Sequence, residues 1–181
     1  MSGAADKKAS KLLSLVLRHD PGAIGLTLDV GGWAKVTELL AKTDVFEGPD
    51  HLARIVAESD KQRFSLSEDG LRVRANQGHS IAVDLGLVPV APPAVLFHGT
   101  AAKSVENIMA EGLKPGARNH VHLSADEATA LRVGQRHGKP VVLCVDAAGM
   151  GQSSIAFYRS ENGVWLTDHV PVAFLSVSRA V

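Results

Sequence analysis

Hydrophobic residues near the start of the chain follow a helical pattern. They recur three or four positions apart, at Ala9, Leu12, Leu13 and Val16. This spacing predicts an amphipathic helix from about Lys7 to His19. The helix should end there because Asp20 precedes Pro21, and a residue before proline is biased away from helical dihedrals.

Two more helices and a hairpin follow. Residues 33–40 carry apolar side chains at helical spacing, and a third helical pattern begins near Asp50. Residues 64–66 and 71–74 then alternate between apolar and polar, with a turn at 68–70 between them. Three short helices followed by a hairpin is the order of a winged-helix module. Such a module binds nucleic acid in some proteins and is only an interaction platform in others, so it does not settle function.

The character of the sequence changes near the middle of the chain. Residues 76–93 are rich in glycine, proline and polar residues, which is typical of a joint between lobes. We therefore predict a first lobe at residues 1–78, a linker at 79–93 and a second lobe at 94–181.

The second lobe opens with a short apolar run, Val95–Phe97, which predicts a buried strand. We expect this strand to stop at a loop formed by His98, Gly99 and Thr100. Gly99 would allow a ligand to approach the backbone, and Thr100 can offer both a hydroxyl and an amide. The loop is therefore a candidate binding element.

Further helices and strands complete the second lobe. A helix should end at Gly112, a plausible C-terminal cap. Ser124 and Glu127 fit a capping box, so Ser124 is predicted as the N-cap of a helix that runs to about His137. Strands are expected at residues 140–146, around 157–158, at 163–167 and at 172–177. The fold class is therefore α+β.

Composition and charge narrow the classes of function. The chain has 181 residues, of which 45% are hydrophobic, and its net charge is zero. A non-specific nucleic-acid binder usually carries a basic excess, so an anion site here must be local. No apolar run has the length of a membrane span, and the N-terminus lacks a signal-peptide core. With a single cysteine, Cys144, the protein is expected to be cytoplasmic.

Several common active sites lack their sequence signals. Neither the dinucleotide-binding glycine pattern nor the P-loop pattern occurs. His120 and His122 share one face of an extended segment but lack the context of a zinc site. A two-histidine metal site stays open, although no metal is expected. The remaining arginines and histidines suit phosphate and ribose groups. Arg18 and His19 could also simply complement a helix dipole. These residues alone indicate no more than a nucleotide- or phosphate-handling protein.

An ordered set of motifs is more specific. They are K-L-L-S-L-V-L-R-H-D-P, G-W-A-K-V-T-E-L-L, D-K-Q-R-F, L-F-H-G-T, G-L-K-P-G-A-R-N-H-V-H-L-S, V-G-Q-R-H-G-K-P and N-G-V-W-L-T-D-H-V-P. Together they span about residues 8–177. In this order the chain closely resembles the NAD-dependent RNA 2′-phosphotransferases of the tRNA 2′-phosphotransferase family.

The resemblance implies a fold and a reaction. An N-terminal winged-helix lobe would precede a C-terminal lobe of the ADP-ribosyltransferase fold. The enzyme would remove an internal RNA 2′-phosphate by transferring it to NAD, a consumed co-substrate. The reaction would pass through ADP-ribosylated RNA and give RNA with a 2′-hydroxyl, ADP-ribose 1″,2″-cyclic phosphate and nicotinamide. The partners would be tRNA-like RNA carrying a 2′-phosphate and NAD, with no membrane, and the protein is expected to be a monomer.

The resemblance also assigns residues. The family's catalytic Arg-His-Arg-Arg set falls on Arg18, His19, Arg63 and Arg118. By motif position, the NAD contacts fall on His98, Gly99, Thr100, His122 and Ser124. The third signature position of the wider fold, often glutamate, is Val164, which disfavours a glutamate-dependent protein-modifying enzyme. His120 is as well explained by a packing role as by a ligand role.

Two other functions remain open from the sequence. The protein could cap phosphorylated nucleic-acid ends with ADP-ribose and stop after the first step. It could also be a non-enzymatic winged-helix regulator whose second lobe senses NAD. The intact Arg-His-Arg-Arg set argues against the regulator, because a sensor would not need it.

Overall fold

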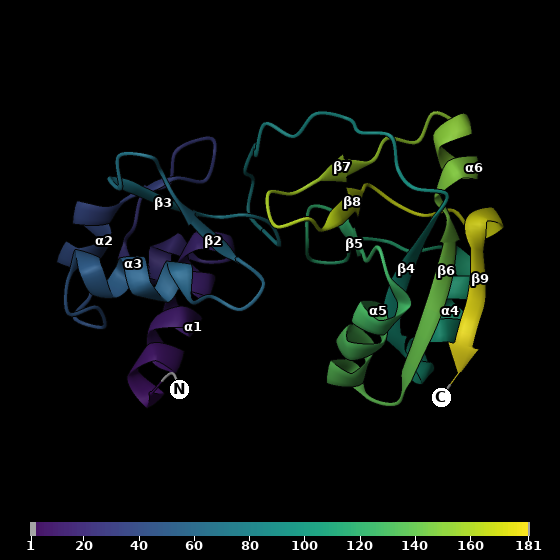
Figure 1. Cartoon of the computed structure of the whole chain (residues 1–181), viewed down its shortest axis with the longest axis horizontal. Coiled ribbons are helices and arrows are strands. Elements are labelled where there is room, and N and C mark those ends of the chain that lie inside the picture. The colour runs from purple at the N-terminus through teal and green to yellow at the C-terminus, as the bar shows by residue number, and fades with distance from the viewer. Residues whose placement is uncertain (1–2, 181) are drawn as a thin grey trace. The chain divides into compact units, whose positions relative to one another are not determined.

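The computed structural model describes the backbone of residues 3–180 and the side chains of residues 3–178. The chain forms two compact units, one ending at Gly86 and the other beginning at Leu87 (Figure 1). This division falls within the segment predicted as a linker. The first part of that segment packs on the first unit, since Asp84 N–H donates to the carbonyl of Val30 at 2.9 Å.

The first unit combines helices with a small antiparallel sheet. Its elements are α1 (Ala4–Arg18), a 3-10 turn (Pro21–Ile24), β1 (Ala34–Lys35), α2 (Val36–Ala41), α3 (Pro49–Ala57), β2 (Phe64–Leu66) and β3 (Arg72–Ala75). The strand order is β1-β3-β2. The hairpin expected from the alternating pattern is present, with Phe64 opposite Ala75. The second predicted helix is shorter than expected, because Ala34 pairs with Val73 and begins a strand instead.

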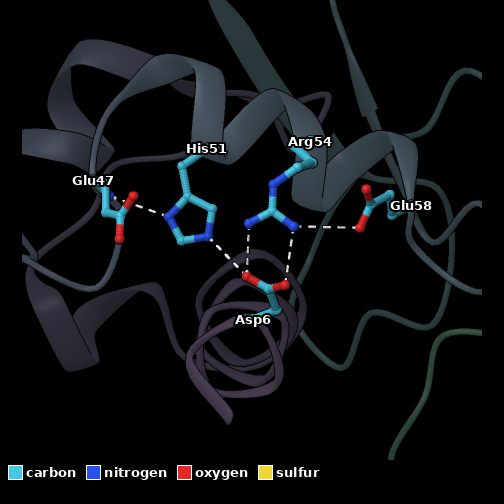
Figure 2. Close-up of polar contacts among 5 residues, drawn as sticks. All are labelled: Asp6, Glu47, His51, Arg54 and Glu58. Carbon is cyan, nitrogen blue, oxygen red and sulfur yellow. Dashed lines mark hydrogen bonds and ion pairs between the residues drawn. The ribbon is translucent and has the colours of Figure 1, made fainter. Parts of the chain in front are cut away.

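A polar network fastens α1 to α3 (Figure 2). Arg54 donates from Nη1 and Nη2 to the two carboxylate oxygens of Asp6, at 2.9 Å each. His51 Nδ1 accepts from the backbone N–H of Glu47 at 3.2 Å. Its Nε2 therefore carries the ring proton and donates to Asp6 Oδ1 at 3.1 Å. The Arg54 hydrogen bonds, followed by the His51 bond, hold the pKa of Asp6 well below its usual range.

The second unit contains two three-stranded antiparallel sheets. Its elements are β4 (Val95–Ala101), α4 (Ala102–Glu111), β5 (Val121–Leu123), α5 (Glu127–Gly134), a 3-10 turn (Gln135–His137), β6 (Pro140–Asp146), α6 (Ala147–Gln152), β7 (Tyr158–Arg159), β8 (Trp165–Thr167), a 3-10 turn (Val172–Phe174) and β9 (Leu175–Ala180). The sheets have the orders β4-β6-β9 and β5-β8-β7 (Figure 1). A bridge between Phe97 and Ser124 joins them.

Each unit has its own hydrophobic core. In the first, α1 contributes Leu13 and Leu17, which pack with Leu52 of α3 and Phe64 of β2. In the second, Phe157 and residues of both sheets form the core. Helices and strands thus occur in both units, consistent with the α+β prediction. Within residues 3–180, no helix is both long enough and apolar enough to cross a membrane.

The expectation of a loop at His98, Gly99 and Thr100 is wrong. These residues continue β4, where Gly99 is opposite Val142 of β6. The strand also explains the glycine. A Cβ on Gly99 would lie 1.7 Å from the carbonyl oxygen of Ala130, because α5 packs directly on this backbone. Gly99 therefore has a packing role that its sequence context did not indicate.

The predicted capping role of Ser124 is also wrong. The helix begins at Glu127, and its N-cap is Asp126, whose side chain accepts from Thr129 N–H at 2.7 Å. Ser124 instead lies two residues before this cap, in a β-bridge with Phe97 that has backbone hydrogen bonds of 2.8 and 2.9 Å. Aspartate caps a helix as well as serine does, so the competing cap two residues later prevails.

Candidate functional site

Three of the residues assigned by resemblance meet at the C-terminus of α1. Arg18 is the last residue of the helix and His19 is its C-cap. Arg18 Nη2 donates to the backbone carbonyl of Arg63 at 3.4 Å. Its guanidinium carbon also lies 5.5 Å from the centre of the Phe64 ring. This stacking over Phe64 fixes the direction of the arginine while its cationic end remains partly exposed.

Arg63 is held by an unusual backbone turn. The two residues before it, Lys61 and Gln62, have φ angles of 63° and 46°, which side-chain-bearing residues rarely adopt. Asn76 supports this turn by donating from Nδ2 to the carbonyl of Gln62 at 2.7 Å. Arg63 N–H donates to Ser59 Oγ at 2.8 Å. Because such backbone persists only where its surroundings impose it, the position of Arg63 is strongly determined.

The segment after β3 packs against the cluster formed by Arg18, His19 and Arg63. Ser80 N–H donates to the carbonyl of Arg18 at 2.9 Å, and Ser80 Oγ lies 2.9 Å from His19 Nδ1. The neighbouring His79 is buried. Burial is the largest influence that lowers the pKa of His79 to about 4, and the positive charges around it add to the effect. At neutral pH His79 therefore adds no charge to the cluster.

A second group gathers where β4 meets β5. His98 Nδ1 lies 3.0 Å from the backbone carbonyl of His122. A carbonyl can only accept, so Nδ1 carries the proton and donates. Burial lowers the pKa of His98, and this outweighs the opposing effect of the hydrogen bond. At neutral pH the ring is therefore uncharged, with a lone pair on Nε2 that can accept a hydrogen bond.

Arg118 belongs to the same group. Its Nη1 lies 2.5 Å from Nδ1 of His122. Because a guanidinium only donates, Nδ1 of His122 must accept and carries no proton. The proton of the neutral ring is then on Nε2. His98 and His122 thus have opposite tautomers, so one ring offers an acceptor and the other a donor at Nε2.

Gly99, Thr100 and Ser124 are the other residues assigned to NAD, and each lies in or beside a strand of the second unit. Gly99 and Thr100 lie in β4 and are buried, against α5. Ser124 lies in the bridge that joins the two sheets and is partly exposed. His120 packs edge-on against Tyr158, with ring centres 5.7 Å apart, and its Nε2 is 3.9 Å from Asp168 Oδ1. These contacts account for His120 structurally.

The structure thus places the assigned residues in two groups. Arg18, His19 and Arg63 are together in the first unit, while His98, His122 and Arg118 are together in the second. Among residues 3–178, no cluster of three or more His, Cys, Asp or Glu side chains is arranged to hold a metal ion.

Sequence reasoning missed Asn76 and Ser80, which support the first group. Both were assigned to the edge of a joint, on the basis of the glycine and polar residues around them. Their partners lie between 11 and 62 positions away, so no local pattern reveals the contacts. The available signal was the density of polar residues in Asn-Gln-Gly-His-Ser directly after a strand.

Comparison with known proteins identifies relatives along almost the whole chain. The family model described as "RNA 2'-phosphotransferase, Tpt1 / KptA family" matches residues 4–169. A protein of Agrobacterium fabrum named a probable RNA 2′-phosphotransferase is 60% identical over 172 residues, covering 93% of this chain and 92% of its own. Proteins of the same name from Acaryochloris marina and Pectobacterium carotovorum are 56% and 52% identical. They cover 93% and 97% of this chain, and 94% and 96% of their own lengths.

Proposed function

Because the chain belongs to the RNA 2′-phosphotransferase family, we propose that it removes an internal 2′-phosphate from RNA by transferring it to NAD. The observation that carries the proposal is the cationic cluster of Arg18, His19 and Arg63, held together by the 61–63 turn and by residues 76–80. The guanidinium of Arg63 also lies 3.7 Å from Asp60 Oδ2. Such an arrangement suits a dianionic phosphate, since guanidinium groups match its oxygens in geometry and charge. The first unit then corresponds to a winged-helix lobe and the second to an ADP-ribosyltransferase-like lobe.

In the first step, an oxygen of the RNA 2′-phosphate attacks the ribose carbon that bears nicotinamide. The new bond joins phosphate oxygen to carbon, and the breaking carbon–nitrogen bond returns its electron pair to the pyridinium ring. Nicotinamide therefore leaves as a neutral molecule. The attacking oxygen is already negatively charged, so the step needs positioning more than it needs a base.

In the second step, the neighbouring ribose 2″-hydroxyl attacks phosphorus. The bond between phosphorus and the RNA 2′-oxygen breaks, and the cyclic phosphate forms on the ADP-ribose. The hydroxyl loses one proton and the departing RNA oxygen gains one, so the step is balanced in charge. Negative charge grows on the phosphoryl oxygens, where arginine donors lower the barrier.

The roles follow from the chemistry of each group. Arg18 and Arg63 hold the phosphate. Arg118, the fourth member of the family's set, lies in the second unit beside His122. His19 is exposed, and an imidazole N–H can donate to the phosphate or to the departing oxygen. In the second unit, His98 and His122 offer an acceptor and a donor that suit the hydroxyl and amide groups of NAD.

The direct test is to incubate the protein with a 2′-phosphorylated oligonucleotide, with and without NAD. We expect loss of the phosphate only with NAD, and one nicotinamide released for each phosphate transferred. Phosphate release in an NAD-free reaction supplied with metal ions would identify an ordinary phosphatase and overturn the proposal. A stable ADP-ribosylated product without phosphate transfer would instead identify the end-capping activity.

A substitution tests the assignment of roles. Arg63→Ala should lower kcat by roughly 100-fold or more, because a donor to the charged phosphoryl group is lost. NAD affinity measured by calorimetry should change little. Arg132→Ala, an exposed arginine on α5, is the matched control and should behave as the original protein does. If Arg63→Ala weakened NAD binding and kept its kcat, the role of Arg63 would be wrong.

A further inference from the structure

The segment from Asn76 to Ser80 contacts every member of the cationic cluster in the first unit. Asn76 N–H donates to the carbonyl of Arg63 at 3.0 Å. Gly78 lies beside Arg18, where a Cβ at this glycine would be in ordinary van der Waals contact with the guanidinium carbon, at 3.7 Å. Ser80 contacts both residues at the end of α1, through its backbone and through its side chain.

From these contacts we infer that Ser80 is a positioning residue that orients the imidazole of His19 for the transfer reaction. The inference rests on the proposed function of His19. Ser80 Oγ lies 2.9 Å from Nδ1 of His19, a hydrogen bond between residues 61 positions apart. The bond engages Nδ1 and so sets the direction of Nε2, at the other end of the ring.

The physical need for such a bond is clear from the position of His19. The residue is exposed, at the C-cap of α1, with φ −127° and ψ −49°. Its backbone is fixed by an N–H donated to the carbonyl of Leu15 at 2.9 Å. The ring of an exposed histidine, however, can rotate about its side-chain bonds. Holding it in one orientation requires a partner that is itself fixed.

Ser80 is fixed by its own backbone. Its N–H donates to the carbonyl of Arg18, the residue directly before His19. The two hydrogen bonds therefore join Ser80 to consecutive residues and close a small ring of contacts. The backbone bond places the hydroxyl of Ser80 beside the imidazole. Residues held in this way keep reacting groups in productive geometry without touching the substrate.

A purely structural role makes a different prediction. The backbone N–H of Ser80 satisfies one of the carbonyl groups that a helix leaves unpaired at its C-terminus. That contact survives when serine is replaced by alanine. Substituting only the side chain therefore separates the orientation of His19 from the capping of α1.

The test compares the full-length variants Ser80→Ala, Ser80→Thr, His19→Ala and the double variant, with NAD and a 2′-phosphorylated oligonucleotide. Ser153→Ala, an exposed serine of the second unit, is the control and should match the unmodified protein. We expect Ser80→Ala to lower kcat by about tenfold, the order expected for losing one hydrogen bond, with KM values changed less than about threefold. Ser80→Thr should recover most of this loss because it keeps the hydroxyl.

The double variant is decisive. If Ser80 acts through His19, adding Ser80→Ala to His19→Ala should cause no further loss of kcat. The inference would be overturned if Ser80→Ala lowered kcat as much in the His19→Ala background as in the unmodified protein. An unchanged kcat for Ser80→Ala alone would also overturn it.

A second measurement separates this inference from the proposed function. Nitrogen NMR of the His19 ring should show Nδ1 in a hydrogen bond in the unmodified protein and not in Ser80→Ala. If the protein has no phosphotransferase activity but the ring signal changes, the proposed function fails and the orientation of His19 by Ser80 stands. A ring signal typical of an unrestrained imidazole in the unmodified protein would overturn the inference, whether or not the variants fold.

Discussion

Arg118 donates a hydrogen bond to Nδ1 of His122, so a residue assigned to the phosphate is anchored by one assigned to NAD. The two side chains are four positions apart in sequence, on either side of the start of β5. Because the arginine can only donate, this contact fixes the tautomer of the histidine. The orientation of Arg118 and the donor pattern of His122 therefore depend on each other.

The first prediction follows from this dependence. His122→Ala removes the anchor of Arg118, whereas His122→Asn keeps an acceptor close to the position of Nδ1. Both variants should raise the KM for NAD. Only His122→Ala should also lower kcat, by about tenfold, because the loss of one hydrogen bond misplaces the arginine. Steady-state kinetics with the oligonucleotide substrate measure both constants, and equal kcat values in the two variants would contradict the anchoring role.

The second prediction concerns the ionisation of His98. Its pKa is lowered by burial, so the folded protein favours the neutral ring and the unfolded chain binds a proton at higher pH. This histidine therefore favours the folded state above the ordinary value of about 6.5, and the benefit is lost as the pH falls from there towards the lowered pKa. His98→Gln, which cannot titrate, should show a smaller decrease in melting temperature between pH 7.5 and pH 5.

An NMR titration of the unmodified protein provides an independent check. The His98 ring should carry its proton on Nδ1 at neutral pH and should bind the second proton below the ordinary value. A neutral ring protonated on Nε2 would mean that the hydrogen bond to His122 is absent in solution.

The third prediction concerns the network of Asp6, His51 and Arg54. The pKa of Asp6 is depressed, so its carboxylate stabilises the folded first unit above the ordinary pKa of about 3.9, and this is lost as the pH falls through the depressed value. Asp6→Asn should lower the melting temperature by several degrees at pH 7. The difference from the unmodified protein should shrink below about pH 4. Asp44→Asn, at an exposed aspartate of the same unit, is the control.

The fourth prediction tests the packing of α5 on β4. Gly99→Ala places a Cβ at 1.7 Å from a backbone carbonyl, which only a shift of the whole helix can relieve. We expect the second unit to be destabilised by about 3 kcal/mol or more. Gly151→Ala is the matched control, since its Cβ would meet only Pro92, at 3.8 Å. Denaturant unfolding measures both variants, and a stable Gly99→Ala protein would show that α5 is not fixed as described.

Some of these elements could be predicted from the sequence because their signals are local. The helix that ends at Arg18, the hairpin of β2 and β3, and the strand from Pro140 to Asp146 all follow apolar spacing or alternation within a short window. The α4 helix ends at Glu111, with Gly112 as its cap at φ 82°.

Other features depend on partners that are distant in sequence. Nothing near Gly99 indicates that β4 continues to Ala101, because the pairing partner β6 lies about forty residues later. The capping error at Ser124 has a similar origin, since its bridge to Phe97 decides its backbone conformation. The roles of Asn76 and Ser80 were hidden for the same reason. Resemblance to a family identified candidate site residues but gave no information on what holds them.

The separation of the two hydrophobic cores has a consequence for how the protein is made. Each core is built from one continuous stretch of chain, the first complete by Ala75 and the second beginning at Leu96. Domains of this kind fold as units during synthesis, the N-terminal one first. The first unit can therefore acquire its structure while the second is still being translated. The residues assigned to the phosphate, Arg18, His19 and Arg63, would then be held in place before the second core is complete.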